Sequence, residues 1–429
     1  MSVQNLARRL LPTLIAGSFA GSAGAAGFAL LEQNASGIGN AFAGTAASAE
    51  DASTIFSNPA GMAFLPAGKM HFAGSIDLVR PSATFHNAGN SSPATLGLAP
   101  PGPFPYGGNG GDIGSWNIVP AVYFAMPIND KISVGVGVGA PFGLKTEYDK
   151  DWVGRFQATR SEIKTINVNP SISFRPNERM AFGFGINYQR LEADLRNQVV
   201  TGAPAEAAGK IEGDDNAWGY NLGAIFQLSQ NMRLGLAYRS AVKYDLKGNF
   251  KLDAFGGALN GDIQAKVKLP DSFTISVAQK LSDKWEMLGD LQWTGWSKLQ
   301  ELAIYRTSGP LLTREVLEWR NTVRVAFGGN YLYSQAWKFR FGLAYDQSPV
   351  GDTHRLSRLP DNDRFWLSAG AQWKPAGMPG AVDFGLAYLF MRKPTINNNQ
   401  GSPATKGLLS GDYNGANVII LGAQYSQSF

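Results

Sequence analysis

The sequence predicts an all-β protein, a transmembrane antiparallel β-barrel of 14 strands plugged by an N-terminal segment. Three observations favour this fold class. Apolar and polar residues alternate with a period of two, short polar turns recur about every 50 residues, and the chain opens with a secretion signal. The 25 Phe, 14 Tyr and 10 Trp, with only 17% charged residues, suit aromatic belts at two membrane interfaces.

Residues 1–25 have the pattern of a secretory signal peptide. Arg8 and Arg9 precede an apolar run from Leu10 to Ala20, and small residues follow at Ala23–Ala25. Removing this segment lowers the formal charge from +5 to 5 − 2 = +3, which gives no basic field for nucleic acid. The chain has no Cys, so disulfides and thiolate metal sites are excluded. We expect no cofactor, no metal and no nucleic-acid partner.

Residues 26–66 are expected to form a plug, gate or linker. From Ala26 to Gly61 they are dominated by Ala, Gly and Ser, and they match neither an amphipathic helix nor an alternating strand. The β-barrel is expected to occupy residues 67–429. In Ile132–Gly139 the alternation is complete, with branched residues on one face and Ser or Gly on the other. Phe339–Asp346 repeats this pattern with three aromatic side chains.

The turns set the strand count. Six short polar turns would join seven hairpins and so give 14 strands; they are 127–131, 176–179, 229–232, 282–284, 334–336 and 375–380. The longer connections at 81–115, 196–217 and 395–414 are expected to be external loops. The chain ends at Phe429 with Tyr425 four residues before it, which resembles the assembly signal of bacterial outer-membrane proteins.

These features predict a monomer in the Gram-negative outer membrane, in contact with lipid, lipopolysaccharide and, through Phe429, the barrel assembly machinery. A soluble β-propeller or sandwich would show the same alternation. The signal peptide, the terminal Phe and the asymmetry between short turns and long loops favour the barrel. His71, His86 and His354 lie in no Ser or Cys motif, so we expect no enzyme activity.

The chain resembles the FadL/TodX family of outer-membrane transporters for long-chain fatty acids and other hydrophobic compounds. The similarity covers the whole mature chain. It rests on short motifs in a fixed order: Ala26–Phe28, Ser36–Gly39, Asn58–Ala60, Pro127–Asp130, Pro141–Leu144, Tyr238–Ser240, Trp296–Ser297, Asp346–Val350 and Pro360–Gly370. The resemblance implies a barrel closed by an N-terminal hatch. It also implies capture of substrate at external loops, a hydrophobic pocket beside the hatch, and lateral exit at a kink in the third strand.

A fatty acid needs an apolar channel and a cation for its carboxylate. Phe28 and Leu30 of the hatch are candidates to line the channel, and the family places the residue equivalent to Phe28 at the pocket. Arg320 and Arg324 share a predicted inward face because Val323 and Val325 would face lipid, and a buried Arg binds carboxylate strongly. Arg320 also lies where the family carries a basic binding residue, and Arg196 near a second such position.

The third strand is the candidate exit. Gly137 and Gly139 leave its inner face open, and Pro141 removes a ladder donor, so pairing should fail there. The gate is expected to comprise Asn58, Pro59, Ala60, Gly137, Gly139, Pro141, Phe142 and Gly143. By family resemblance, Asn58–Ala60 would fill the gap beside Pro141. An ordinary strand end at Pro141 is the simpler alternative.

We therefore expect a passive uptake channel for long-chain fatty acids. Monoaromatic or other neutral hydrocarbons are the alternative substrates for the same route. A general porin is the alternative of another kind, but it needs a wet constriction and no plug.

Overall fold

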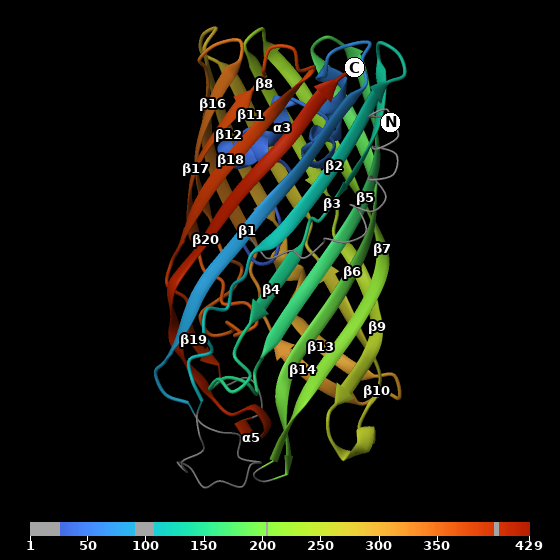
Figure 1. The fold of residues 1–429 in the computed structure, drawn as a ribbon. Coiled ribbons are helices and arrows are strands. Elements are labelled where there is room, and N and C mark those ends of the chain that lie inside the picture. The colour runs from blue at the N-terminus through green and yellow to red at the C-terminus, as the bar shows by residue number, and fades with distance from the viewer. Residues whose placement is uncertain (1–25, 91–106, 203–204, 399–402) are drawn as a thin grey trace, which may run out of the picture.

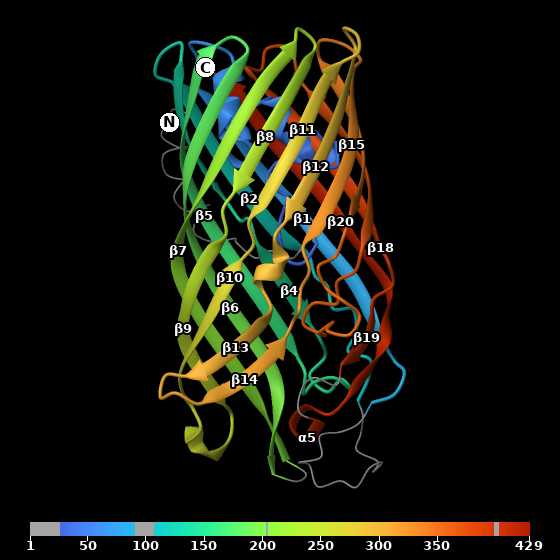
Figure 2. The same ribbon diagram turned by 180° about the vertical axis from the view of Figure 1, so that it is seen from behind.

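A computed structural model describes residues 26–90, 107–202, 205–398 and 403–429, so the predicted signal peptide lies outside the described part of the chain. The strands form an elongated, closed, tilted barrel with the N-terminal segment inside one end (Figures 1 and 2). None of the described helices is both long enough and apolar enough to cross a membrane.

The barrel wall contains the 14 predicted antiparallel spans. Nine are continuous: β1 (His71–Asn87), β2 (Asn117–Pro127), β5 (Arg160–Asn177), β6 (Met180–Gly202), β7 (Ala205–Ser229), β16 (Trp337–Asp346), β17 (Arg364–Trp373), β18 (Gly380–Met391) and β20 (Leu409–Ser428). β1 pairs with β20 from His71↔Ser428 onward and closes the cylinder. A short strand, β19 (Thr395–Asn398), also pairs with β20.

The other five spans are each broken into two strands. They are β3 (Ile132–Gly139) with β4 (Gly143–Glu147), β8 (Met232–Arg239) with β9 (Val242–Leu252), β10 (Gly261–Leu269) with β11 (Ser272–Lys280), β12 (Trp285–Thr294) with β13 (Glu301–Arg306), and β14 (Leu311–Val316) with β15 (Thr322–Leu332). The predicted break at Pro141 is present, between β3 and β4. The other four breaks were not predicted.

The predicted external loop at 196–217 is wrong, and strands also extend into the other two, because β1 continues to Asn87 and β20 begins at Leu409. Residues 196–217 continue the ladder of β6 and β7, with Arg196 opposite Lys210 and Val199 opposite Ala207. Small and polar residues there leave no clear alternation of apolar and polar side chains, but the backbone groups still pair across the two strands. The β6–β7 hairpin therefore extends beyond its neighbours at the end opposite the short turns (Figure 1).

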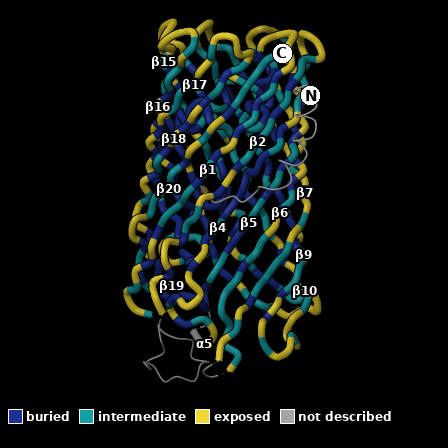
Figure 3. The backbone as a smooth tube through the Cα atoms, viewed as in Figure 1, coloured by how far each residue is buried: buried dark blue, intermediate teal, exposed yellow. Residues whose placement is uncertain are grey.

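The N-terminal segment, which we call the hatch, lies inside the end of the barrel that carries the short turns (Figure 1). It contains α2 (Ala35–Gly39), α3 (Thr45–Ser48), α4 (Thr54–Ser57) and the 3-10 helix η1 (Pro59–Phe64). Its residues are largely buried (Figure 3). Further short helices are η3 (Phe255–Gly257), η4 (Trp296–Lys298) and α5 (Pro403–Lys406).

Glycines of the wall make room for the hatch backbone. A Cβ on Gly235 would collide with the Ala46 carbonyl, and one on Gly342 would collide with Asn40 and Ala41. Each such glycine allows the hatch chain to lie directly against the inner face of a strand.

Buried charges also hold the hatch in place. The Arg340 guanidinium of β16 lies 2.7 Å from Glu50 of the hatch and 2.8 Å from Asp383 of β18, and Asp383 is fully buried. At the start of the hatch, the Ala26 amide nitrogen donates to Asp346 at 3.0 Å and that of Gly27 to Asp361 at 2.8 Å.

Candidate functional site

An apolar cavity occupies the lumen on the external side of the hatch. Its walls are aliphatic side chains of β6, β9, β10 and β13, such as Leu191, Leu246, Ile263 and Ile304, and Phe28 of the hatch reaches it from the other side. Because this lining is almost entirely apolar, the site favours an apolar ligand.

Arg358 is the one charged residue among the described residues that line this cavity. Its Nη1 donates to Ser161 Oγ at 3.0 Å and to the carbonyls of Arg160 at 3.3 Å and Arg196 at 3.4 Å. All three acceptors are neutral, and no carboxylate in the described part of the chain lies within ion-pair distance of Arg358. Burial lowers the pKa of the Arg358 guanidinium because removal from water disfavours its charge.

Loop contacts hold Arg358 in position. Thr146 Oγ1 donates to the Arg358 carbonyl at 3.0 Å, and the Tyr148 hydroxyl donates to the Ser357 carbonyl at 2.7 Å. Since the backbone is fixed on both sides, the guanidinium is pre-positioned at the cavity wall. A charge-assisted bond from an anion would satisfy a cation that has only neutral partners.

A second opening lies on the external side of Arg358. A second cavity shares Arg358, Leu195 and Ile304 with the apolar cavity, and it also reaches Glu315 and Lys406. The Lys406 ammonium lies 2.5 Å from Glu315, which neutralises that carboxylate. This arrangement gives the apolar cavity a mouth toward the external loops.

Four aromatic rings close the inner end of the apolar cavity. The Phe28 ring centroid lies 5.1 Å from that of Trp296, 5.8 Å from Trp319 and 5.9 Å from Phe142. Trp296 and Trp319 pack edge to face at 5.0 Å. Because these offset contacts are favourable, the hatch end is fixed to the wall by Phe28.

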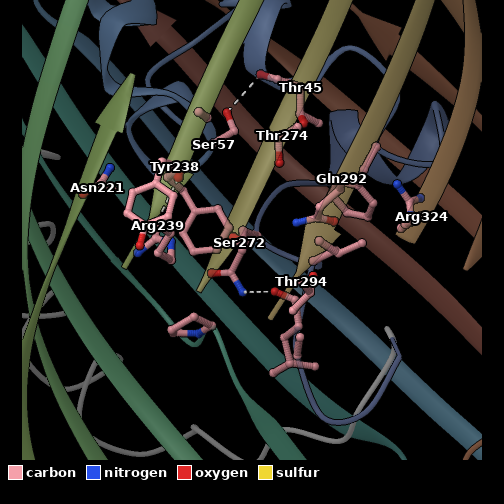
Figure 4. A pocket seen from close by; sticks show the side chains of 18 of the residues that line it. Thr45, Ser57, Asn221, Tyr238, Arg239, Ser272, Thr274, Gln292, Thr294 and Arg324 are labelled. Carbon is pink, nitrogen blue, oxygen red and sulfur yellow. Dashed lines mark hydrogen bonds between the residues drawn. The ribbon is translucent and has the colours of Figure 1, made fainter. Parts of the chain in front are cut away.

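Beyond these rings lies a more polar cavity, bounded by the hatch and by β8, β11, β12 and β15 (Figure 4). Figure 4 shows Arg239 and Tyr238 on one side of it and Gln292 and Arg324 on the other. Pro141 and Phe142 also line it. The aromatic group therefore separates an apolar chamber from a polar chamber next to the third span.

The break in the third span opens the wall between β2 and β4. β3 pairs with β2 only from Val122↔Val138 to Pro127↔Ser133, whereas β4 pairs with β5 alone. The hatch start covers this break: the Leu30 nitrogen donates to the Pro141 carbonyl at 2.9 Å, and the Gly143 nitrogen donates to the Phe28 carbonyl at 2.9 Å. Gln33 Nε2 adds a bond of 2.8 Å to the Ala140 carbonyl.

Asn58–Ala60 was expected in this gap, and that placement is wrong. Asn58 Nδ2 donates to the carbonyls of Ala224 on β7 and Leu236 on β8, and Pro59 and Ala60 lie against Gly183 of β6. Residues 28–33 reach Pro141 instead, because Ala29 forms an antiparallel bridge with Phe142. Of the expected gate glycines, Gly137 faces Ile55 and Gly139 faces Gln33 of the hatch.

Two predicted arginines do not line the cavity. The Arg320 side chain is 64% exposed, and its Nε donates to the Ser348 carbonyl. β15 begins only at Thr322, so counting alternate residues back from Val323 fails at Arg320. Arg196 faces outward, where Asp194 lies 2.6 Å from its guanidinium, while the adjacent Leu195 faces the cavity.

Arg324 faces the lumen as predicted, but it binds the hatch. It donates to the Ala41 carbonyl, packs over the Trp366 ring at 5.1 Å and lines the polar cavity. Leu30 is buried and lines the same polar cavity, whereas Phe28 lines the apolar one. Trp296, Trp319 and Arg358 were not predicted from the sequence. The first two lie in strand breaks, and Arg358 lies in a loop.

Comparison with known proteins places these features in context. The sequence model of a family described as "Outer membrane protein transport protein (OMPP1/FadL/TodX)" matches residues 16–429. The chain is 31% identical to the long-chain fatty acid transport protein of Salmonella typhi, over 87% of this chain and 89% of that protein. Its fold is similar to that of a Pseudomonas aeruginosa FadL homologue, with a TM-score of 0.86 at 24% identity over 94% and 99% of the two chains. The Ralstonia pickettii toluene transporter TbuX gives 0.67 at 17%, over 93% and 100%.

Proposed function

This chain belongs to the OMPP1/FadL/TodX family of outer-membrane transport proteins, and we propose that its substrates are long-chain fatty acids, which it carries passively to the outer membrane. Membership of this family indicates that the chain transports hydrophobic compounds and lies in the Gram-negative outer membrane. The choice of a fatty acid over a neutral hydrocarbon is our inference from the cavity.

A single observation carries this choice. The apolar cavity has one guanidinium on its wall among the described residues, and the partners of that guanidinium are neutral. An alkyl tail gains about 0.8 kcal/mol for each buried CH₂ group, so a long chain gains more from apolar walls than one aromatic ring does. A carboxylate at Arg358 would add about 1.5–3 kcal/mol through a charge-assisted hydrogen bond.

The proposed route has three steps. The substrate enters at the mouth beside Lys406 and Glu315, and its tail fills the apolar cavity while its carboxylate stays at Arg358. Withdrawal of Phe28 then joins the apolar and polar chambers. Because residues 28–30 also cover the β3–β4 break, the same movement exposes a lateral exit toward the lipid.

The test compares oleate and toluene uptake by a transporter-null strain that expresses the wild type or Arg358→Met. Loss of the charge should reduce oleate uptake at limiting concentration about tenfold or more and leave toluene uptake unchanged. Arg196→Met is the matched control, since it removes an arginine that faces away from the cavity. Its uptake of both compounds should equal that of the wild type.

Two results would contradict the proposal. If the wild type raises toluene uptake but never raises oleate uptake above the empty vector, the substrate is a neutral hydrocarbon. If Arg358→Met takes up oleate as the wild type does, Arg358 does not bind the carboxylate. Barrel assembly of each variant is checked by the shift in gel mobility between heated and unheated samples.

A further inference from the structure

The outer face of β9 and β10 carries a group of lysines that the transport route does not use. Lys243, Lys247 and Lys251 on β9 and Lys266 and Lys268 on β10 alternate with inward-facing apolar residues, such as Tyr244, that line the lumen. The lysines therefore project from the outside of the barrel. Asp245 and Asp262 are the only acidic residues on this face of the two strands.

These lysines have no ion-pair partner in the described part of the chain. Register places Lys243 directly opposite Lys268, and Lys266 opposite Asp245. Like charges at opposite positions of an antiparallel pair are destabilising. An anion from outside would relieve this repulsion.

On the neighbouring outer surface of β5, β6 and β7, by contrast, the basic side chains form ion pairs within the protein. This surface also carries five basic side chains, each paired with a carboxylate: Arg160, Lys164, Arg190, Arg196 and Lys210. Asp214, which lies opposite Lys247 across β7 and β9, already binds Arg190 at 2.9 Å. The unpaired charge on β9 and β10 is therefore a local property, not a general feature of this surface.

The position of the lysines relative to the membrane interface indicates which kind of anion they could bind. On β7, outward-facing Tyr220 and Trp218 end the apolar belt, and the Tyr238 ring of β8 lies 6.0 Å from that of Tyr220. Aromatic residues of this kind mark the membrane interface. Lys243 follows Tyr238 by five residues in the sequence, and β9 continues from β8 away from the short turns (Figure 2). The lysines thus begin where the external leaflet presents its polar headgroups.

We propose that Lys243, Lys266 and Lys268, with Lys247 and Lys251 beside them, bind the phosphate groups of lipopolysaccharide in the external leaflet. Lipopolysaccharide carries several phosphates at the edge of its acyl layer, which matches a cluster of lysines next to an aromatic belt. Lysine is a compact cation that contacts phosphate oxygens as a point charge. The site is separate from the lumen, so it does not depend on the proposed substrate.

The test measures binding of purified lipopolysaccharide to the full-length mature protein in detergent, for the wild type and for the variant Lys243→Gln/Lys266→Gln/Lys268→Gln. We expect the variant to bind about tenfold more weakly or worse, since each lysine near an anionic surface contributes. The control variant Lys164→Gln/Arg190→Gln/Lys210→Gln removes the same charge from the paired face. It should bind within about twofold of the wild type.

Three arms decide the outcome. Enzymatically dephosphorylated lipopolysaccharide should bind the wild type and the lysine variant equally weakly. If it binds the wild type as tightly as the intact lipid does, phosphate recognition is wrong. If both triple variants weaken binding equally, or if phosphatidylglycerol vesicles compete as well as lipopolysaccharide, the patch is a general charge effect and the proposal is overturned. Uptake by the lysine variant should equal wild-type uptake, which shows that the barrel is assembled.

Discussion

Apolar and polar residues alternate in both halves of the barrel, but they face opposite ways. In the half near the short turns the apolar residues face outward, and in the external half they face the lumen. On β8 and β11, Leu236 and Ile275 face lipid while Gly235 and Ser276 face the hatch. On β9 and β10 the apolar residues turn inward to the cavity, and lysines turn outward. The strand breaks at 240–241 and 270–271 shift the phase by one residue, which exchanges the two faces.

This difference follows from what each half touches. In the membrane the outer face must be apolar, so the inner face can hold the polar contacts, glycines and ion pairs of the hatch. Outside the membrane the outer face meets water and headgroups, so the inner face is free to be apolar. The protein can therefore place an oily cavity directly beyond a polar plug.

The largest loss of stability is expected from removing a buried ion pair in the half of the barrel that holds the hatch. Arg340→Met leaves the buried Asp383 carboxylate without its cation and leaves Glu50 with Lys338 alone, which should destabilise the protein by about 3–5 kcal/mol. Denaturant unfolding of the purified barrel measures this loss. Arg190→Met breaks an exposed pair and should cost less than about 1 kcal/mol. Equal losses in the two variants would show that the buried pairs do not hold the hatch.

A smaller loss is expected from filling the space of a glycine. Gly342→Leu forces a side chain into the Asn40–Ala41 backbone and should cost about 3 kcal/mol, because backbone cannot move aside as a side chain can. Gly289→Leu is the matched control: apart from Gly289 and its two chain neighbours, no described atom lies within 4 Å of the place that a Cβ would take there. Thermal unfolding of the two variants compares them. A stable Gly342→Leu protein would mean that the hatch packs loosely.

Sequence reasoning found the fold because its signals are global. Fourteen spans and their short turns follow from a period of two repeated along the chain. The cavity was harder to predict because alternation fixes faces only within an unbroken strand. Arg320 lies in the break before Thr322, where the face assigned from Val323 no longer applies. The exchange of inner and outer faces after Ser240 was not predicted, although the sequence carries a sign of it: Lys243 and Lys247 alternate with Val242 and Leu246.

Other parts of the site had no local signal. Arg358 reaches the cavity through a loop whose position depends on Thr146 and Tyr148, more than 200 residues away in sequence. Phe28, which the family resemblance predicts at the substrate pocket, lines the apolar cavity. The resemblance did not place Asn58–Ala60, whose contacts with β6, β7 and β8 depend on glycines of the wall. Long-range contacts of this kind cannot be read from spacing alone.

The hatch also contains a buried acid that should make its stability depend on pH. Burial raises the pKa of Glu32 to about 7, partly offset by Arg364 and Arg324, and Asp77 lies nearby without a hydrogen bond in the described structure. As pH rises from about 4.5 to 7, the unfolded chain ionises at this site while the folded chain stays protonated, so folding loses free energy.

Glu32→Gln removes this penalty. The variant should be more stable than the wild type at pH 8 by on the order of 2–3 kcal/mol, and equal to it at pH 4. Thermal unfolding at the two pH values measures the difference. A constant difference at both pH values would show that the change acts through packing instead of ionisation.

The smallest effect is expected at the boundary between the halves. Phe28→Ala removes the ring that closes the apolar cavity, so the tail of a bound fatty acid should lose its contact with that ring, and oleate affinity should fall about tenfold. Leu30→Ala is the matched control, because Leu30 is buried two residues away but lines the polar cavity. Oleate binding to both purified variants measures the difference. If Leu30→Ala weakens binding as much as Phe28→Ala does, the aromatic group does not divide the lumen, and substrate contacts both cavities from the start.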